Sequence, residues 1–319
     1  MKEFGEKDRP ARVLVLRGGA IGDFVVTLPV LQWLRLTGPG AVIDLACHPR
    51  VAPLAHGLVS QWRDIDSAVF LPLHNDAAME GHAVVDFLGN YDFVLSFLGS
   101  RTKPAGRLRE LIEDRAFCLD PVPGSNSTHV TAFFFEQIAL AGFPAPSIEE
   151  AGHILPVIDV DSDRRREAAA LLGSLGLKPD QALIAVHPGS GSPGKNAPAG
   201  VLAEACTWLV DAFEYLAVVL VKGEADEAAV EALQDQLRAR LPVIETPDLG
   251  VLAAALGECA LFVGHDSGVS HIAAAVATPT VAIFVSSDPA VWMPRGPRVA
   301  CAEPTVASIR AAAVSLARR

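Results

Sequence analysis

The sequence predicts an α/β protein made of two doubly wound halves, each a parallel sheet with helices on both faces. Three observations lead to this fold class. Short apolar segments alternate with helical segments along the chain, several of these segments end in glycine-rich polar loops, and half of the 319 residues are apolar although only 6% are aromatic. Parallel sheets buried between helices have such a composition, because their strands are rich in Val, Ile and Leu. The length is sufficient for two domains.

The first half contains five apolar runs that predict strands. They are residues 12–17, 41–47, 67–71, 91–97 and 116–119. Residues 24–36 predict a helix that is kinked or starts late at Pro29, because proline cannot donate a backbone hydrogen bond. Residues 129–141 predict a second helix, whose three consecutive phenylalanines, 133–135, should be largely buried.

The composition changes to Asp, Pro and Arg between residues 156 and 163, which predicts a domain boundary. We therefore expect an N-terminal domain over residues 1–160 and a C-terminal domain over residues 161–319. The second half repeats the alternation, with a loop over residues 289–297 that carries Trp292. Its predicted strands are residues 183–186, 216–221, 243–245, 259–263 and 280–284, and its predicted helices are residues 164–172, 201–213, 228–240, 249–256, 272–277 and 308–319.

Bulk properties exclude several function classes. The net charge of −11 argues against a general nucleic-acid binder. The five cysteines have neither metal nor redox spacing, so we expect reduced, mostly buried thiols in a cytoplasmic protein. The polar N-terminus does not have the apolar core of a signal peptide, and no apolar run reaches the roughly 18 residues of a membrane span. Any membrane contact should therefore be peripheral.

The loop between the predicted strand 259–263 and the predicted helix 272–277 is the richest candidate site. It lies at the carboxyl end of a strand, where open α/β sheets bind ligands. It also leads into a helix N-terminus, whose free N–H groups attract anions, so a diphosphate is the favoured ligand. The alternatives are a packing role for the second histidine and a metal site formed with His265. The candidate residues are Asp266, Ser267, Gly268, Ser270 and His271.

Two further candidate sites follow strands of the second half. In the loop over residues 187–195, Ser190 and Ser192 can donate hydrogen bonds and Lys195 supplies a positive charge to a phosphate. A flexible surface loop is the simpler alternative, and the spacing is not that of a Walker loop. Glu224 ends the next strand and either binds ribose hydroxyls or is a solvated surface charge.

The first half offers a candidate base and a basic cluster. Asp23 ends a glycine turn over residues 17–23 and is either a helix cap or a general base for an attacking hydroxyl. The turn lacks the G-x-G-x-x-G spacing, which argues against an NAD-dependent dehydrogenase. The basic cluster is either a solvated helix face or a site for an acidic acceptor. It consists of Arg101, Lys103, Arg107, Arg109 and Arg115.

Three motifs, taken together, make the chain resemble the bacterial heptosyltransferases of glycosyltransferase family 9 over nearly its full length. The first joins Arg17, Gly22 and Asp23 to the run Thr27-Leu28-Pro29. The second is the run from Pro188 to Ser192, followed by Lys195. The third joins Asp266-Ser267-Gly268 and His271 to Ala273-Ala274-Ala275, Pro279, Phe284 and Asp288-Pro289. Their order and spacing are specific, whereas any one alone is weak.

The resemblance implies a GT-B fold, in which two Rossmann-like domains face each other across a cleft. The acceptor domain comes first, the nucleotide-sugar domain second, and the last helix packs back on the first domain. It also implies an inverting, metal-independent transferase without a cofactor, which moves heptose from ADP-heptose to a lipopolysaccharide core acceptor. We expect such an enzyme in the cytoplasm, at the inner face of the inner membrane.

The resemblance also implies roles for individual residues. Asp23 is the base, Lys195 and the loop from Asp266 to His271 hold the diphosphate, and Glu224 contacts the ribose. The candidate acceptor-binding residues are Arg17, Gly22, Arg101, Lys103 and Arg107. The chain departs from the family pattern at Asn196-Ala197-Pro198, where Arg-Trp-Pro is frequent, and at Val269, where a proline is usual.

These departures leave another nucleotide sugar open as the donor. Two other functions are also compatible with the motifs. A nucleotide-sugar epimerase of the same fold would bind a diphosphate and need no acceptor. A non-catalytic member of the family would bind the donor and transfer nothing.

Overall fold

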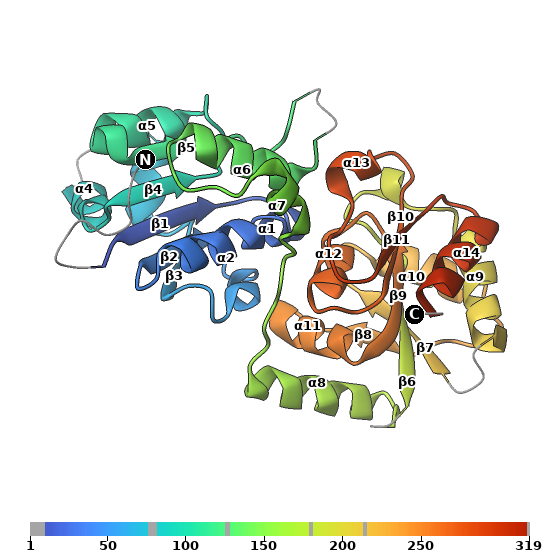
Figure 1. Ribbon diagram of the computed structural model, residues 1–319. Helices are drawn as coiled ribbons and strands as arrows, with labels where there is room; N and C mark the ends of the chain where they lie inside the picture. The colour runs from blue at the N-terminus through green and yellow to red at the C-terminus, as the bar shows by residue number, and fades with distance from the viewer. Residues whose placement is uncertain (1–9, 76–81, 125–127, 179–180, 213–215, 318–319) are drawn as a thin grey trace. The chain divides into compact units, whose positions relative to one another are not determined.

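The computed structural model describes residues 10–75, 82–124, 128–178, 181–212 and 216–317. The chain divides into two units, Met1–Ile154 and Leu155–Arg319, and each contains one parallel sheet with helices packed on it (Figure 1). The division falls a few residues before the boundary that the composition predicts. The prediction of a doubly wound α/β fold is confirmed in both units.

The first unit contains a five-stranded parallel sheet in the order β3-β2-β1-β4-β5. The strands are β1 (Arg12–Arg17), β2 (Val42–Cys47), β3 (Gln61–Asp64), β4 (Phe93–Ser96) and β5 (Ala116–Cys118). The helices are α1 (Ile21–Val25), α2 (Leu28–Thr37), α3 (Leu71–His74), α4 (His82–Gly89), α5 (Lys103–Ile112), α6 (Val130–Leu140) and α7 (Ile148–His153). Leu14 and Leu16 pack in a buried cluster with α3, α4 and α5, while α2 packs against β2 and α6.

One strand prediction in this unit is wrong. Residues 67–71 do not form a strand, because they lie in a short 3-10 turn and the start of α3. One edge strand of the sheet is instead β3, and its side chains are mostly exposed, with Trp62 half-exposed. The sequence therefore has no apolar run at β3 that would predict this strand. The predicted burial of the phenylalanines is confirmed for Phe134 and Phe135, while Phe133 is half-buried.

The helix predicted over residues 24–36 is divided into α1 and α2. Pro29 has no N–H to donate to the preceding turn, which accounts for a break near this position. In addition, the carbonyl oxygen of Asp23 accepts hydrogen bonds from the Arg17 guanidinium and from the Thr27 hydroxyl. The last turn of α1 is therefore fixed by side chains.

The second unit contains a six-stranded parallel sheet in the order β11-β10-β9-β6-β7-β8. The strands are β6 (Ala182–His187), β7 (Leu216–Lys222), β8 (Val243–Glu245), β9 (Cys259–His265), β10 (Thr280–Ile283) and β11 (Val299–Ala302). The helices are α8 (Ser162–Ser174), α9 (Ala199–Ala212), α10 (Glu227–Gln234), α11 (Leu249–Gly257), α12 (Gly268–Ala275), α13 (Pro289–Trp292) and α14 (Val306–Ala317). A buried cluster joins one face of the sheet to α9, α10 and α14.

Several boundaries in this unit differ from the predictions. The edge strand β11 was not predicted, because it is short and half-exposed. Residues 289–297 are not all loop, since Asp288 caps α13 by accepting a hydrogen bond from the Ala290 N–H at 2.8 Å. Helix α12 begins at Gly268 and α10 ends at Gln234, both earlier than predicted. The predicted helix ends at residues 213 and 318–319 lie outside the described residues.

The final helix, α14, packs against β10, β11 and α9 of its own unit. Its expected packing on the first domain stays a prediction. No helix within the described residues is long and apolar enough to cross a membrane.

Candidate active site

The loops after β6, β7 and β9 carry the polar residues of the second unit. These three strands are parallel neighbours in the sheet, so their carboxyl ends lie side by side at one end of it (Figure 1). Open α/β sheets bind ligands at this carboxyl end. Most of the residues that the sequence singled out in this half lie there.

Lys195 and Asp266 form an ion pair at this carboxyl end of the sheet. The Lys195 Nζ donates a hydrogen bond to Asp266 Oδ2 at 2.7 Å, and the Ser287 hydroxyl donates to the same oxygen at 2.6 Å. The Asp266 side chain is 7% exposed and that of Lys195 is 37% exposed. His271 Nε2 lies 4.0 Å from the other carboxylate oxygen. A buried carboxylate therefore holds a partly exposed ammonium group beside α12.

Two serines shape the start of α12. The Ser267 Oγ accepts a hydrogen bond from the Ser270 N–H at 3.4 Å, which caps the helix. The Ser270 hydroxyl donates to the carbonyl oxygen of His265. Both side chains are buried. The backbone N–H groups that begin at Gly268 give this helix end a partial positive charge, which favours an anion.

A buried network that the sequence did not predict joins the same three loops. His187 Nε2 donates to Asp226 Oδ2, 2.8 Å away, and the same oxygen accepts the Gly223 N–H at 2.8 Å. His187 Nδ1 lies 3.3 Å from the Ser267 Oγ. The loops after β6, β7 and β9 are thereby tied to one another. The signal that could have found this network is a polar side chain directly at the end of a buried strand.

His265 has a structural role, which argues against its use as a metal ligand. Its Nε2 accepts the Ala197 N–H at 2.8 Å, and its Nδ1 lies 3.4 Å from the carbonyl oxygen of Gly189. Both ring nitrogens are therefore engaged. Burial, with a smaller effect of the nearby His187, lowers the pKa of His265 to about 4. The imidazole is neutral at physiological pH and braces the loop after β6.

This pKa predicts a loss of stability in acid. Because the folded protein binds the His265 proton only near pH 4, an unfolded chain with an ordinary pKa of about 6.5 takes it up first as the pH falls. The contribution of the neutral His265 imidazole to the stability of the folded protein is complete above about pH 6.5 and is lost as the pH falls towards 4. We expect His265→Gln to make the pH dependence of the unfolding free energy shallower in this window, by up to about 1.4 kcal/mol per pH unit. Urea unfolding at several pH values measures it.

The matched control for this experiment is His56→Gln, because His56 is exposed. This variant should keep the wild-type pH dependence. An equal slope for His265→Gln and the wild type would contradict a low pKa for the buried imidazole.

The loop after β6 is held close to the sheet. The Ser190 hydroxyl lies 2.5 Å from Asn196 Oδ1 and 2.7 Å from the Ser192 carbonyl oxygen, so it bonds within the loop. Ser192 itself is exposed. At Gly189 an added Cβ would lie 1.8 Å from Asp226 Oδ1, so only glycine fits beside this carboxylate.

Gly189→Ala should therefore destabilise the protein by about 1–3 kcal/mol, the usual cost of overpacking. The methyl group would displace Asp226, which is 6% exposed and bonded to His187. Chemical denaturation measures the effect. Gly194→Ala is the control in the same loop, because its Cβ would meet nothing within 4 Å. Equal stability of the two variants would contradict this prediction, because it would show that the loop can shift to accommodate a methyl group at Gly189.

In the first unit, Asp23 lies in α1 directly after the glycine turn that follows β1. Its Oδ2 accepts the Ala20 N–H at 3.1 Å, and the side chain is 32% exposed. The Arg17 side chain is 2% exposed and donates to the carbonyl oxygen of Asp23 from Nε at 3.0 Å and Nη2 at 2.6 Å. Burial lowers the pKa of Arg17 to about 10, although the Asp23 charge opposes this shift. The buried Arg17 side chain therefore holds the backbone of Asp23 in place through these two hydrogen bonds.

The remaining predicted site residues are exposed or half-buried. Arg101 is exposed just before α5 and Lys103 is exposed at its first position, while half-buried Arg107 donates to Glu110 on the same helix at 2.7 Å. Gly22 is half-buried in α1. Glu224 is exposed in the turn after β7.

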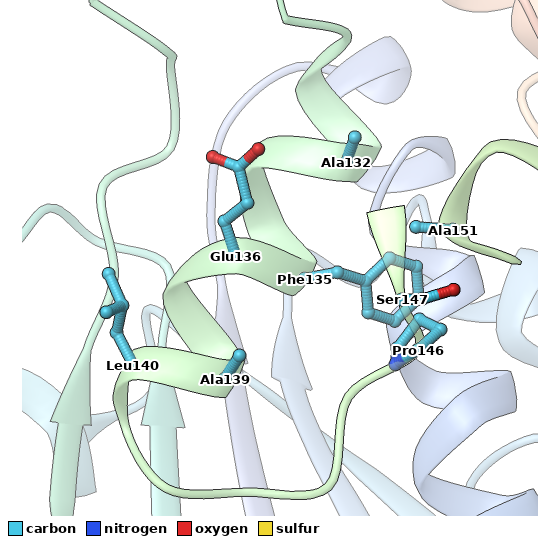
Figure 2. A pocket seen from close by; sticks show the side chains of 8 residues that line it. All are labelled: Ala132, Phe135, Glu136, Ala139, Leu140, Pro146, Ser147 and Ala151. Atoms are coloured by element: carbon cyan, nitrogen blue, oxygen red, sulfur yellow. The ribbon is translucent and has the colours of Figure 1, made fainter. Parts of the chain in front are cut away.

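A cavity of about 530 Å³ lies elsewhere in the first unit, between α6 and α7. Figure 2 shows Phe135, Pro146 and Ala151 gathered at one side of it, with Glu136 at the other. The lining residues are Ala132, Phe135, Glu136, Ala139, Leu140, Pro146, Ser147 and Ala151. They include none of the predicted site residues and are mostly apolar, so we place the candidate site at the strand ends.

Comparison with known proteins identifies the family. The family model of glycosyltransferase family 9 (heptosyltransferase) matches residues 135–309, which is more than half of the chain. The chain belongs to glycosyltransferase family 9. This family 9 member is therefore a glycosyltransferase, and the resemblance inferred from the three motifs is confirmed. A search of curated proteins finds no match.

Solved structures of other family 9 proteins share the GT-B-like fold of this glycosyltransferase. A glycosyltransferase family 9 protein from Veillonella parvula has a TM-score of 0.77 at 18% identity, over 96% of this chain and 97% of the other. The ADP-heptose lipopolysaccharide heptosyltransferase II of E. coli has a TM-score of 0.72 at 20% identity, over 96% and 98%. The E. coli heptosyltransferase WaaC with ADP has a TM-score of 0.64 at 18% identity, over 96% and 99%.

Proposed function

We propose that this family 9 glycosyltransferase transfers a heptose, or a related sugar, from ADP-heptose to a lipopolysaccharide core or a similar glycan acceptor. The observation that carries the proposal is the Lys195–Asp266 pair beside the N-terminus of α12. A partly exposed ammonium group and a helix N-terminus together favour a diphosphate. The solved structures of E. coli WaaC with ADP and with ADP-2-deoxy-2-fluoro heptose support this donor class.

In the proposed reaction, Asp23 takes the proton of an acceptor hydroxyl while that oxygen attacks the anomeric carbon. The new C–O bond forms on the face opposite the diphosphate, so the configuration inverts. The bond between the anomeric carbon and the diphosphate oxygen breaks, and ADP leaves with one more negative charge. Lys195 and the N–H groups at the start of α12 stabilise that charge, as preorganised charges and dipoles do in such sites. No metal ion takes part in this chemistry.

In the proposed mechanism the other residues have three roles: some contact the donor, some position those that do, and some bind the acceptor. Ser192, exposed in the loop after β6, and Gly268, at the start of α12, contact the donor phosphates directly. Glu224 contacts the ribose. The side chains that are bonded within the protein position these groups, and the basic residues at the start of α5 and just before it bind an acidic acceptor at the cytoplasmic face of the membrane. The positioning residues are Arg17, Ser190, Asp266, Ser267, Ser270 and His271, and the acceptor-binding residues are Gly22, Arg101, Lys103 and Arg107.

The experiment that tests the proposal measures ADP release from ADP-heptose with and without a lipopolysaccharide core acceptor. Release that requires the acceptor, with the sugar recovered on it, is the expected result. Conversion of the donor alone to an isomer would identify an epimerase instead. A rise in melting temperature with donor but no turnover would identify a non-catalytic binding protein. A larger rise with another nucleotide sugar would replace ADP-heptose as the donor.

A further inference from the structure

A group of metal-ligating side chains lies in the first unit, outside the residues assigned above. His48 directly follows β2, Asp64 ends β3, and Asp66 lies two residues beyond it. One potential ligand atom from each of the three side chains lies within 4.8 Å of the other two. His48 Nδ1 and Asp66 Oδ2 are 3.1 Å apart. An imidazole and two carboxylates therefore converge on one point.

The sheet fixes the backbone that carries this group. Cys47 and Asp64 are paired in register between β2 and β3. The N–H of Ile65 continues the pairing by donating to the Cys47 carbonyl oxygen at 3.1 Å, and the Ile65 side chain is buried. The Asp66 N–H donates to Asp64 Oδ1 at 3.0 Å. Because the backbone that carries the ligands is held in place before binding, less conformational freedom is lost when a cation binds than in a flexible loop.

The charges at this point favour a cation. Two carboxylates at close range repel each other, and a divalent cation between them reverses this repulsion. The neighbouring Arg63 has its guanidinium 5.1 Å from the centroid of the Phe87 ring.

We propose that His48, Asp64 and Asp66 bind a divalent first-row cation such as Mn²⁺ or Zn²⁺. One imidazole nitrogen and two carboxylate oxygens suit these ions, and three protein ligands leave coordination positions open. His48 is 41% and Asp66 74% exposed, so those positions are accessible to water or to an oxygen of an anionic ligand. The site adjoins the turn before Asp23, because a Cβ at Gly18 would lie 4.0 Å from His48 Nε2.

The experiment titrates the full chain with Mn²⁺ alone and measures the free ion by electron paramagnetic resonance. We expect one bound equivalent, and an affinity about tenfold or more lower in His48→Gln and in Asp66→Asn. The controls are His56→Gln and Asp86→Asn, which change exposed residues of the same types and should bind as the wild type does.

Absence of binding by the wild type, or equal binding by the two site variants, would overturn the proposal. Melting temperatures show whether each variant is folded, and since both ligands are partly exposed, neither substitution should prevent folding. The proposed site does not depend on the proposed transfer reaction. A protein that fails the sugar-transfer assay can still bind Mn²⁺ at these residues.

Discussion

Asp23→Asn should lower the rate of sugar transfer by about 10²–10⁴-fold, the usual contribution of a general base. Asparagine keeps an oxygen for the Ala20 N–H, which Asp23 Oδ2 accepts at 3.1 Å, so the turn should be preserved. Asp23 belongs to the first unit and the Lys195–Asp266 pair to the second, so the affinity for ADP should stay at the wild-type value. Steady-state kinetics and calorimetry measure the two effects separately.

The control for this variant is Asp86→Asn, which removes an exposed carboxylate from α4 of the same unit and should leave turnover unchanged. Wild-type turnover by Asp23→Asn would exclude Asp23 as the base. A decrease in both turnover and ADP affinity would contradict a role limited to proton transfer.

Lys195→Met should weaken ADP binding about 10–100-fold, since hydrogen bonds to charged groups contribute about 1.5–3 kcal/mol. It should also lower kcat by about 10²–10³-fold, the usual effect of removing one group that stabilises developing charge. The substitution also leaves the Asp266 carboxylate, 7% exposed, without its cation. Calorimetry with ADP measures the first effect, and single-turnover kinetics with saturating donor measures the second.

A double variant separates the two consequences of losing Lys195. In Lys195→Met combined with Asp266→Asn, the repulsion between the uncompensated carboxylate and the diphosphate is removed, so ADP affinity should partly recover while kcat stays low. Lys178→Met, at an exposed lysine of the same unit, is the control. Unchanged ADP affinity in Lys195→Met would contradict a role for this lysine at the diphosphate.

The elements of the fold were predictable where their burial is regular. Strands β1 and β9 are almost wholly buried, so an apolar run marks them in the sequence. The edge strands β3 and β11 were missed because their side chains are mostly exposed or half-exposed, which erases the pattern. The other two edge strands, β5 and β8, were predicted, because enough apolar residues remain in them to mark a strand.

The candidate site was predictable only in part for a related physical reason. Glycine turns, Lys195 and the polar start of α12 follow strands and are visible as local motifs. The partners of these residues come from other loops: Asp266 is 71 positions from Lys195, and His187 is 39 positions from Asp226. Which polar side chains meet depends on the order of strands in the sheet, because that order decides which loops are neighbours.

The sequence by itself determined the fold class, the family resemblance and the loops that carry polar chemistry. These follow from local periodicity, glycine turns and motif spacing, which tertiary contacts do not alter. Only the tertiary structure decided which of those residues are engaged by the protein and which are exposed to a ligand. In the sequence, Arg17 is a candidate acceptor-binding residue and His265 a possible metal ligand, but burial and backbone hydrogen bonds make them supports for the loops beside them.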